Sequence, residues 1–159
     1  MFFCERLGGA EQSFGFAGEI WMFQKEKEDP YFIIAALHTD TRHGRLAGGT
    51  HCGVIGDDWP SFETAIEHIA DKAENMREKL AVSGLMDACD VDGMKMGIVC
   101  SRQLEPRERV EAFQFLGFIA KMIGDYIDPK NPKSILIGGD MGTRAKDLSV
   151  ASKIAPDNI

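Results

Sequence analysis

The chain has 159 residues, 44% of them hydrophobic, and a formal net charge of −7 at pH 7. This length and apolar content suit one globular domain with its own core, and the acidic balance argues against nucleic acid or an anionic membrane as a partner. The four cysteines are scattered without a Cys-x-x-Cys pair, so neither a zinc site nor a redox motif is indicated, and no other pattern predicts a metal site.

Residues 1–30 are predicted to form a strand and a turn of the same domain as the rest of the chain. The apolar run from Ile20 to Phe23 predicts the strand, and the charged stretch that ends at Pro30 predicts the turn. No basic run precedes the apolar residues at the N-terminus, and no apolar run approaches membrane-spanning length. We therefore expect no signal peptide, no membrane and a cytoplasmic location.

The next strand is predicted at residues 31–38, where an almost continuous apolar run is typical of a strand buried on both faces. A polar loop, residues 39–45, follows it. The first helix is predicted to begin after Ser61, a suitable N-cap, because apolar residues then recur at i, i+3, i+4 and i+7 as far as Leu80. We expect this helix to end between Leu80 and Gly84.

Two more pairs of strand and helix complete the chain. After an acidic loop, residues 87–92, an apolar run predicts a buried strand at residues 94–100, and Pro106 opens an amphipathic helix. A proline-containing turn then leads to a short strand at residues 134–137 and a helix around residues 148–154. Parallel strands need long crossover connections, which are usually helices, so we predict an α/β fold: a three-layer sheet with parallel pairs flanked by helices.

Four short segments, taken in order, resemble a known enzyme family. They are Leu46-Ala47-Gly48-Gly49-Thr50, Asn75-Met76-Arg77-Glu78-Lys79, Gly93-Met94-Lys95 and Gly139-Asp140-Met141-Gly142-Thr143. With these segments, residues 31–159 resemble the N-terminal, substrate-binding and dimerisation domain of the glutamate/leucine/phenylalanine/valine dehydrogenases. The resemblance implies an amino-acid-dehydrogenase-like fold, a small-molecule amino acid or 2-oxo acid as substrate, and a homo-oligomer.

The resemblance assigns substrate-binding roles to four residues. Gly48 and Gly49 match a Gly-Gly loop whose backbone approaches the substrate, as glycine permits. Lys79 takes the place of the lysine that binds the substrate carboxylate, and Met76 belongs to the same segment. The alternatives are an ordinary flexible turn for the glycines and a solvated lysine near a helix end for Lys79.

The resemblance assigns catalysis to Lys95 and Asp140. Lys95 matches a lysine that activates water to attack an imine, and Asp140 matches an aspartate that shuttles protons in oxidative deamination. Burial and a second cation, here Lys79, would favour the uncharged form of such a lysine and let it accept a proton. The alternatives are a strand-edge lysine in solvent and a turn or helix-capping aspartate.

Some features depart from the family pattern. The sequence contains no Gly-x-Gly-x-x-Gly fingerprint, so NAD or NADP is implied by the family but not expected to bind this chain alone. Gly139 replaces a glutamate, Arg77 and Glu78 replace a small and an aromatic residue, and Asp90 or Asp92 could pair with Lys95 away from the site.

Two hypotheses of different classes follow. In the first, the chain is a fragment or a subunit of an amino-acid dehydrogenase, and it works with a nucleotide-binding partner chain. In the second, it is a non-catalytic, stand-alone amino-acid-binding or assembly module. Convergence of Lys79, Lys95 and Asp140 on one cleft would favour a surviving site, whereas pairing of Lys95 with Asp90 or Asp92 elsewhere would count against it.

Overall fold

The computed structural model describes residues 2–7 and 15–159; Met1 and residues 8–14, part of the predicted region 1–30, lie outside the described residues. Within this part of the chain the strands are β1 (Phe3–Arg6), β2 (Glu19–Gln24), β3 (Tyr31–Leu37), β4 (Arg45–Val54), β5 (Val91–Cys100) and β6 (Ile135–Gly139). The helices are α1 (Phe62–Ser83), α2 (Leu85–Ala88), α3 (Pro106–Ile127) and α4 (Ala145–Ile154). No helix among the described residues is long and apolar enough to cross a membrane.

The six strands form one mixed sheet in the order β1-β2-β3-β5-β4-β6. Strand β4 lies parallel to both of its neighbours, β5 and β6, whereas the pairs from β1 to β5 are antiparallel. Helix α1 connects β4 to β5, and α3 connects β5 to β6, as parallel crossovers require. The predicted α/β sheet with parallel pairs is therefore confirmed, and β1 to β3 add an antiparallel portion that the sequence pattern did not indicate.

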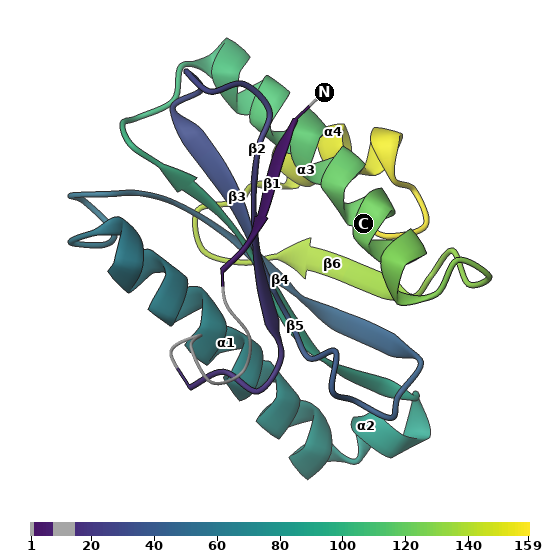
Figure 1. Ribbon diagram of the computed structural model, residues 1–159. Coiled ribbons are helices and arrows are strands. Elements are labelled where there is room, and N and C mark those ends of the chain that lie inside the picture. The colour runs from purple at the N-terminus through teal and green to yellow at the C-terminus, as the bar shows by residue number, and fades with distance from the viewer. Residues whose placement is uncertain (1, 8–14) are drawn as a thin grey trace.

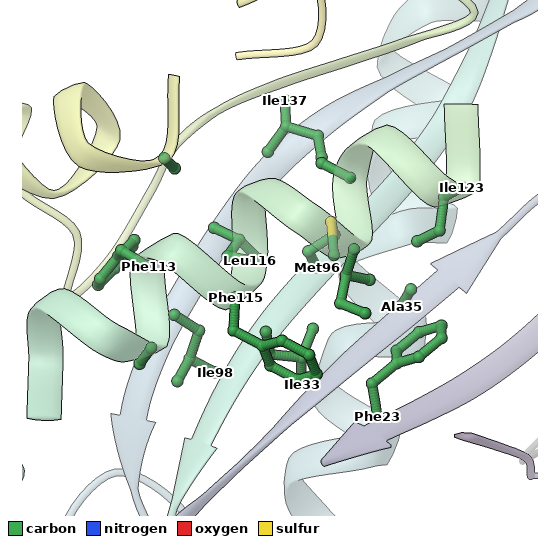
Figure 2. Packing of buried hydrophobic residues seen from close by; sticks show 14 of the residues in the cluster. Phe23, Ile33, Ala35, Met96, Ile98, Phe113, Phe115, Leu116, Ile123 and Ile137 are labelled. Atoms are coloured by element: carbon green, nitrogen blue, oxygen red, sulfur yellow. The ribbon is translucent and has the colours of Figure 1, made fainter. Parts of the chain in front are cut away.

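Helices cover both faces of this sheet, as Figure 1 shows, with α1 on one side and α3 and α4 on the other. Each face has its own cluster of buried hydrophobic residues. Figure 2 shows the cluster under α3, where helix and strand side chains face each other: Phe113, Leu116, Ile123, Met96 and Ile98. The molecule is thus built in three layers.

Strand β5 lies at the centre, and all ten of its residues are buried. Its even-numbered apolar residues, from Met94 to Cys100, belong to the cluster under α3. Side chains alternate along a strand, so the odd-numbered residues Gly93, Lys95 and Gly97 face α1. A Cβ on Gly97 would lie 2.2 Å from the Ile69 Cδ1 atom of α1. The glycines on either side of Lys95 therefore let α1 approach the sheet closely.

The predicted start and end of α1 and the predicted start of α3 are confirmed, whereas the final helix begins three residues before Leu148. Ser61 caps α1 by accepting a hydrogen bond from the Thr64 N–H at 3.1 Å, and α1 ends at Gly84, whose φ of 78° is in the left-handed region that glycine tolerates. Pro106 opens α3, and the final helix lies at Ala145–Ile154.

Two local predictions are wrong. The predicted Gly-Gly loop at Gly48 and Gly49 is part of strand β4, which begins at Arg45. The acidic segment 87–92 is not a continuous loop, because Asp87 and Ala88 belong to α2 and β5 already begins at Val91. Its acid Asp92 is buried because Arg77 of α1 supplies a counter-charge.

Candidate active site

The six residues that the sequence predicted for the site line one cavity of about 390 Å³. The cavity lies where α1 crosses β4, β5 and the end of β6. Its lining residues are Gly48, Gly49, Lys72, Asn75, Met76, Lys79, Met94, Lys95, Gly138, Gly139 and Asp140. The parallel strand order β5-β4-β6 brings these segments together although they lie far apart in the sequence.

Lys95 crosses the sheet to reach Asp140. Its side chain starts on β5 and is only 4% exposed, and its Nζ forms an ion pair with Asp140 Oδ2 just beyond the end of β6. Strand β4 lies between the two, and its residue at the crossing is Gly49. A Cβ on Gly49 would lie 3.1 Å from the Lys95 Nζ and 3.0 Å from the Asp140 Cβ. Glycine at this position therefore leaves room for the ion pair.

The turn after β6 fixes the Asp140 carboxylate. Its Oδ1 atom accepts a hydrogen bond from the Met141 N–H at 2.8 Å, and the Asp140 N–H donates to Thr143 Oγ1 at 2.8 Å. Burial opposes ionisation of Asp140, but the hydrogen bonds from Lys95 and Met141 and the Lys95 charge outweigh it, so the pKa of Asp140 lies below its usual value. The site thus holds an ionised carboxylate beside a buried ammonium group.

Arg109 of α3 holds the same turn from the other face of the sheet. Its guanidinium donates to the Gly142 carbonyl at 2.6 Å and makes two bonds, of 3.0 and 2.7 Å, to the buried carboxylate of Asp147 in α4. Gly142 also lies against β4, because a Cβ there would be 1.9 Å from the Cys52 carbonyl oxygen. The backbone that carries Asp140 is therefore clamped on both sides.

Helix α1 contributes one stripe of polar and apolar residues to the cavity: Lys72, Asn75, Met76 and Lys79. These positions have the spacing i, i+3, i+4 and i+7, which places them on one face of a helix. Sequence reasoning identified Met76 and Lys79 but missed Lys72 and Asn75. Counting back along the helix face from Lys79 would have found both.

Two histidines, His51 and His68, lie near enough to Lys95 and Asp140 for those charges to act on them, and sequence reasoning missed them because the four histidines form no motif. His51 of β4 is 5% exposed and lies 4.6 Å from the Trp59 ring, measured between ring centroids. The Trp59 Nε1–H donates to His68 Nδ1 of α1 at 2.7 Å, so the neutral ring of His68 carries its proton on Nε2. A signal was available, since His51 is two residues beyond Gly49 on the same strand face.

Burial, followed by nearby positive charges, lowers the pKa of both histidines. Burial, the neighbouring His68 and the Lys95 charge lower the pKa of His51, and burial, Lys72 and Lys95 lower the pKa of His68. Both rings are therefore neutral at pH 7, and the two lysines that act on them are cavity residues.

The alternative partners proposed for Lys95 are engaged elsewhere. Asp92 accepts two hydrogen bonds from Arg77, at 3.0 and 2.9 Å, and Asp90 accepts one from His43 at 3.1 Å. The hypothesis that Lys95 pairs with either acid is wrong, and so is that of a strand-edge lysine in solvent. Lys79 is exposed on α1, but it also lines the cavity.

Comparisons with known proteins place the fold. No family model and no curated protein sequence matches the chain. The crystal structure of hetero-hexameric glutamate dehydrogenase from Thermus thermophilus in its leucine-bound form matches with a TM-score of 0.59 at 16% identity, covering 98% of this chain and 30% of that one. L-Tryptophan dehydrogenase from Nostoc punctiforme matches with a TM-score of 0.57 at 14% identity, covering 82% and 32%. The fold is that of an amino-acid dehydrogenase domain.

This chain spans about a third of the length of those amino-acid dehydrogenases and resembles an N-terminal domain. The implied cofactor, NAD or NADP, does not fit the residues that the structure describes. The helices that follow β4, β5 and β6 begin after Ser61, after Glu105 and after Arg144, and none of the turns before them has the Gly-x-Gly-x-x-Gly pattern that cradles a pyrophosphate. The described residues also contain no group of three or more His, Cys, Asp or Glu side chains that could hold a metal ion.

Proposed function

We propose that this chain is the substrate-binding and oligomerisation part of an NAD(P)-dependent amino-acid dehydrogenase. That enzyme would convert an L-amino acid to a 2-oxo acid by oxidative deamination, with the dinucleotide bound by a domain from elsewhere. The observation that carries the proposal is the meeting of Lys79, Lys95 and Asp140 in one cavity. The fold supports it as well.

In this proposal, α1 and β4 bind the substrate. Lys79 anchors its carboxylate, because an ammonium group that lines the cavity offers three donors to an anion. Met76 supplies an apolar wall beside it. Gly48 and Gly49 line the same cavity with their backbone, and the absence of a Cβ on Gly49 leaves space for a ligand beside Lys95 and Asp140.

In the same proposal, Lys95 and Asp140 transfer protons during the reaction. The ammonium of Lys95 and the carboxylate of Asp140 are already hydrogen-bonded, so a proton can pass from Lys95 to Asp140. The free amine of Lys95 can then take a proton from water as the water oxygen attacks the imine carbon. Asp140 gives its proton to the nitrogen, the C–N bond breaks to release ammonia, and the Asp140 carboxylate accepts the hydroxyl proton as the carbonyl forms. The buried stem of Lys95 and the clamped turn of Asp140 keep the two groups oriented.

The proposal extends to a homo-oligomer in the cytoplasm. The Thermus thermophilus glutamate dehydrogenase is hetero-hexameric, which supports assembly as a property of this kind of domain. All four cysteines are free, which suits a reducing compartment. Sedimentation velocity tests whether the chain forms a homo-oligomer, and a monomer at all concentrations would contradict that part of the proposal.

Binding is tested by isothermal titration calorimetry with a panel of L-amino acids and 2-oxo acids. We expect at least one to bind, and we expect Lys79→Met to weaken it about tenfold or more, the range for a hydrogen bond to a charged group. Lys121→Met is the matched control, since Lys121 is exposed on α3 across the sheet. Binding of no compound in the panel would refute the proposal.

A second candidate function is a non-catalytic, stand-alone module that binds an amino acid or serves assembly. It is favoured by the lack of a dinucleotide site among the described residues and by Gly139 in the place of the family glutamate. Hydride transfer to NAD(P) after addition of a nucleotide-binding chain distinguishes the two. Ligand binding with no transfer in the presence of such chains would favour the module.

A further inference from the structure

His51 of β4 is a buried polar side chain whose ring has no hydrogen-bond partner. It is 5% exposed, and among the described residues no group forms a hydrogen bond with its ring nitrogens. Such a side chain is uncommon, because a polar group removed from water usually has a partner. The reaction steps proposed above do not use this ring. A buried base without a partner is free to take up a proton.

His51 lies directly beyond the ion pair, on the same face of the sheet. The Asp140 Cβ and the Lys95 Nζ lie 3.0 and 3.1 Å from the place that a Cβ on Gly49 would take. His51 is the next residue of β4 on that face, and two residues of strand span roughly 7 Å. Its neighbour on β5 is Gly97, which has no side chain to separate the ring from Lys95.

Two aromatic contacts orient the His51 ring. Its centroid lies 4.6 Å from that of Trp59 and 5.2 Å from that of His68. The Trp59 indole N–H donates to His68 Nδ1 at 2.7 Å, which occupies the lone pair of the neutral His68 ring. Of these two histidines, His51 is therefore the one that can accept a proton without breaking a hydrogen bond.

The charged and titratable groups that act on His51 come from every element around it. They are Lys95 of β5, Asp140 after β6, His68 of α1 and Asp58 of the turn before α1. Burial lowers the pKa of His51 most, His68 and Lys95 lower it further, and the two acids oppose them. His51 in turn helps to lower the pKa of Asp140. The ring and the carboxylate are thus close enough to influence each other.

The proposed reaction leaves one proton at the site in each turnover. Loss of hydride from the amine gives a cationic iminium, and addition of water with release of neutral ammonia yields the 2-oxo acid and one proton. Lys95 ends these steps as an ammonium, as it began, and the extra proton is on Asp140. The ion pair returns only when Asp140 loses that proton. An imidazole is the stronger base, with an ordinary pKa of about 6.5 against about 3.9 for the carboxyl group.

We infer that the neutral ring of His51 takes this proton from Asp140 and releases it to solvent, which restores the Lys95–Asp140 ion pair. The Asp140 O–H bond breaks as an N–H bond forms on the ring. This inference rests on the proposed function and adds a proton-relay residue to it. Its basis is the unpartnered ring on the same face as the pair, together with the proton balance of the reaction.

The test measures the exchange of the Lys95 ammonium protons with water by 15N NMR, in the ligand-free chain and as a function of pH. A proton that leaves Lys95 through Asp140 and His51 should exchange at a rate that follows the neutral fraction of His51 and then levels off. We expect His51→Gln to lose this plateau and to exchange at least about tenfold more slowly near neutral pH. His68→Gln is the matched control, because it removes the adjacent imidazole and should keep the plateau.

The shape of the pH profile separates a relay from a structural role, which would change the rate equally at every pH. Exchange in the wild type that follows hydroxide alone overturns the relay, and so does an unchanged profile in His51→Gln. Loss of the plateau in His68→Gln alone also overturns it. Circular dichroism checks that each variant is folded, and His51→Asn replaces a glutamine variant that is not. Because no ligand is present, failure of every amino acid and 2-oxo acid to bind overturns the proposed function, while the exchange profile still decides whether His51 takes protons from the pair.

Discussion

Replacement of Asp140 by asparagine tests the ion pair at the centre of the site. The side chain of Lys95 is 4% exposed, and that of Asp140 is 40% exposed. Asparagine keeps the shape of aspartate but offers one acceptor oxygen in place of two. It carries no charge, and its NH2 group replaces one of the two oxygens that Met141 and Lys95 bond separately, so Asp140→Asn leaves a buried positive charge without its counter-charge.

The expected cost follows from the burial of the two groups. Removing one member of a fully buried ion pair costs about 3–5 kcal/mol. Water reaches the Asp140 side and can solvate the Lys95 ammonium in part, so we expect a smaller loss, about 1–3 kcal/mol. With a urea m-value of about 2 kcal/mol per M, the unfolding midpoint should fall by roughly 0.5–1.5 M.

A double-mutant cycle with Lys95→Met completes this test. The methionine side chain of that variant is uncharged and needs no counter-ion, so Asp140→Asn should cost much less in its background. We expect a coupling free energy of about 1–2 kcal/mol. Additive effects of the two substitutions, with no coupling, would refute the claim that these side chains act as a pair.

The remaining predictions concern acid, glycine and the second ion pair. The pKa of Asp140 is lowered in the folded state, so near its usual pKa of about 3.9 the unfolded state binds more protons than the folded state. The stability advantage of the wild type over Asp140→Asn should therefore be complete above about pH 5 and should shrink as the pH falls through the folded-state pKa. Urea unfolding at a series of pH values measures this dependence. Gly49→Ala puts a Cβ 3.0 Å from that of Asp140 and should lower ligand affinity in calorimetry, whereas Gly138→Ala meets open space and should not; equal affinities would contradict this account. Arg77→Met leaves Asp92, 4% exposed, without its cation and should destabilise the fold by about 2–4 kcal/mol in thermal or urea unfolding; a loss under about 0.5 kcal/mol would show that Arg77 is dispensable.

Local signals in the sequence were sufficient to predict where α1 begins and ends and where α3 begins. Ser61 and Gly84 bound α1, and Pro106 opens α3, because capping and proline chemistry act within a few residues of the chain. The site residues were found through their resemblance to a family, since no local pattern links Lys79 with Asp140. Their meeting depends on the strand order, which is a long-range property.

The predictions that were wrong or missing also failed because the deciding contacts are distant in the sequence. Strand β4 was not predicted because it contains Gly48 and Gly49, and glycine is depleted in strands. In the structure, Gly49 makes room for Lys95. Asp92 resembled a loop acid because its partner, Arg77, is 15 residues away in the sequence. Strand β1 was missed because all four of its residues are exposed and carry no alternating pattern. In each case a partner distant in sequence decides the local structure.

Backbone NMR during titration tests the central claim most directly, because it reports where a ligand binds. We predict that a bound amino acid or 2-oxo acid shifts the amide signals of Gly48, Gly49 and Asp140, together with those of α1 near Lys79, and that Lys79→Met weakens these shifts. Shifts confined to another cavity, such as that lined by Phe2, Phe115 and Phe118, would contradict the account.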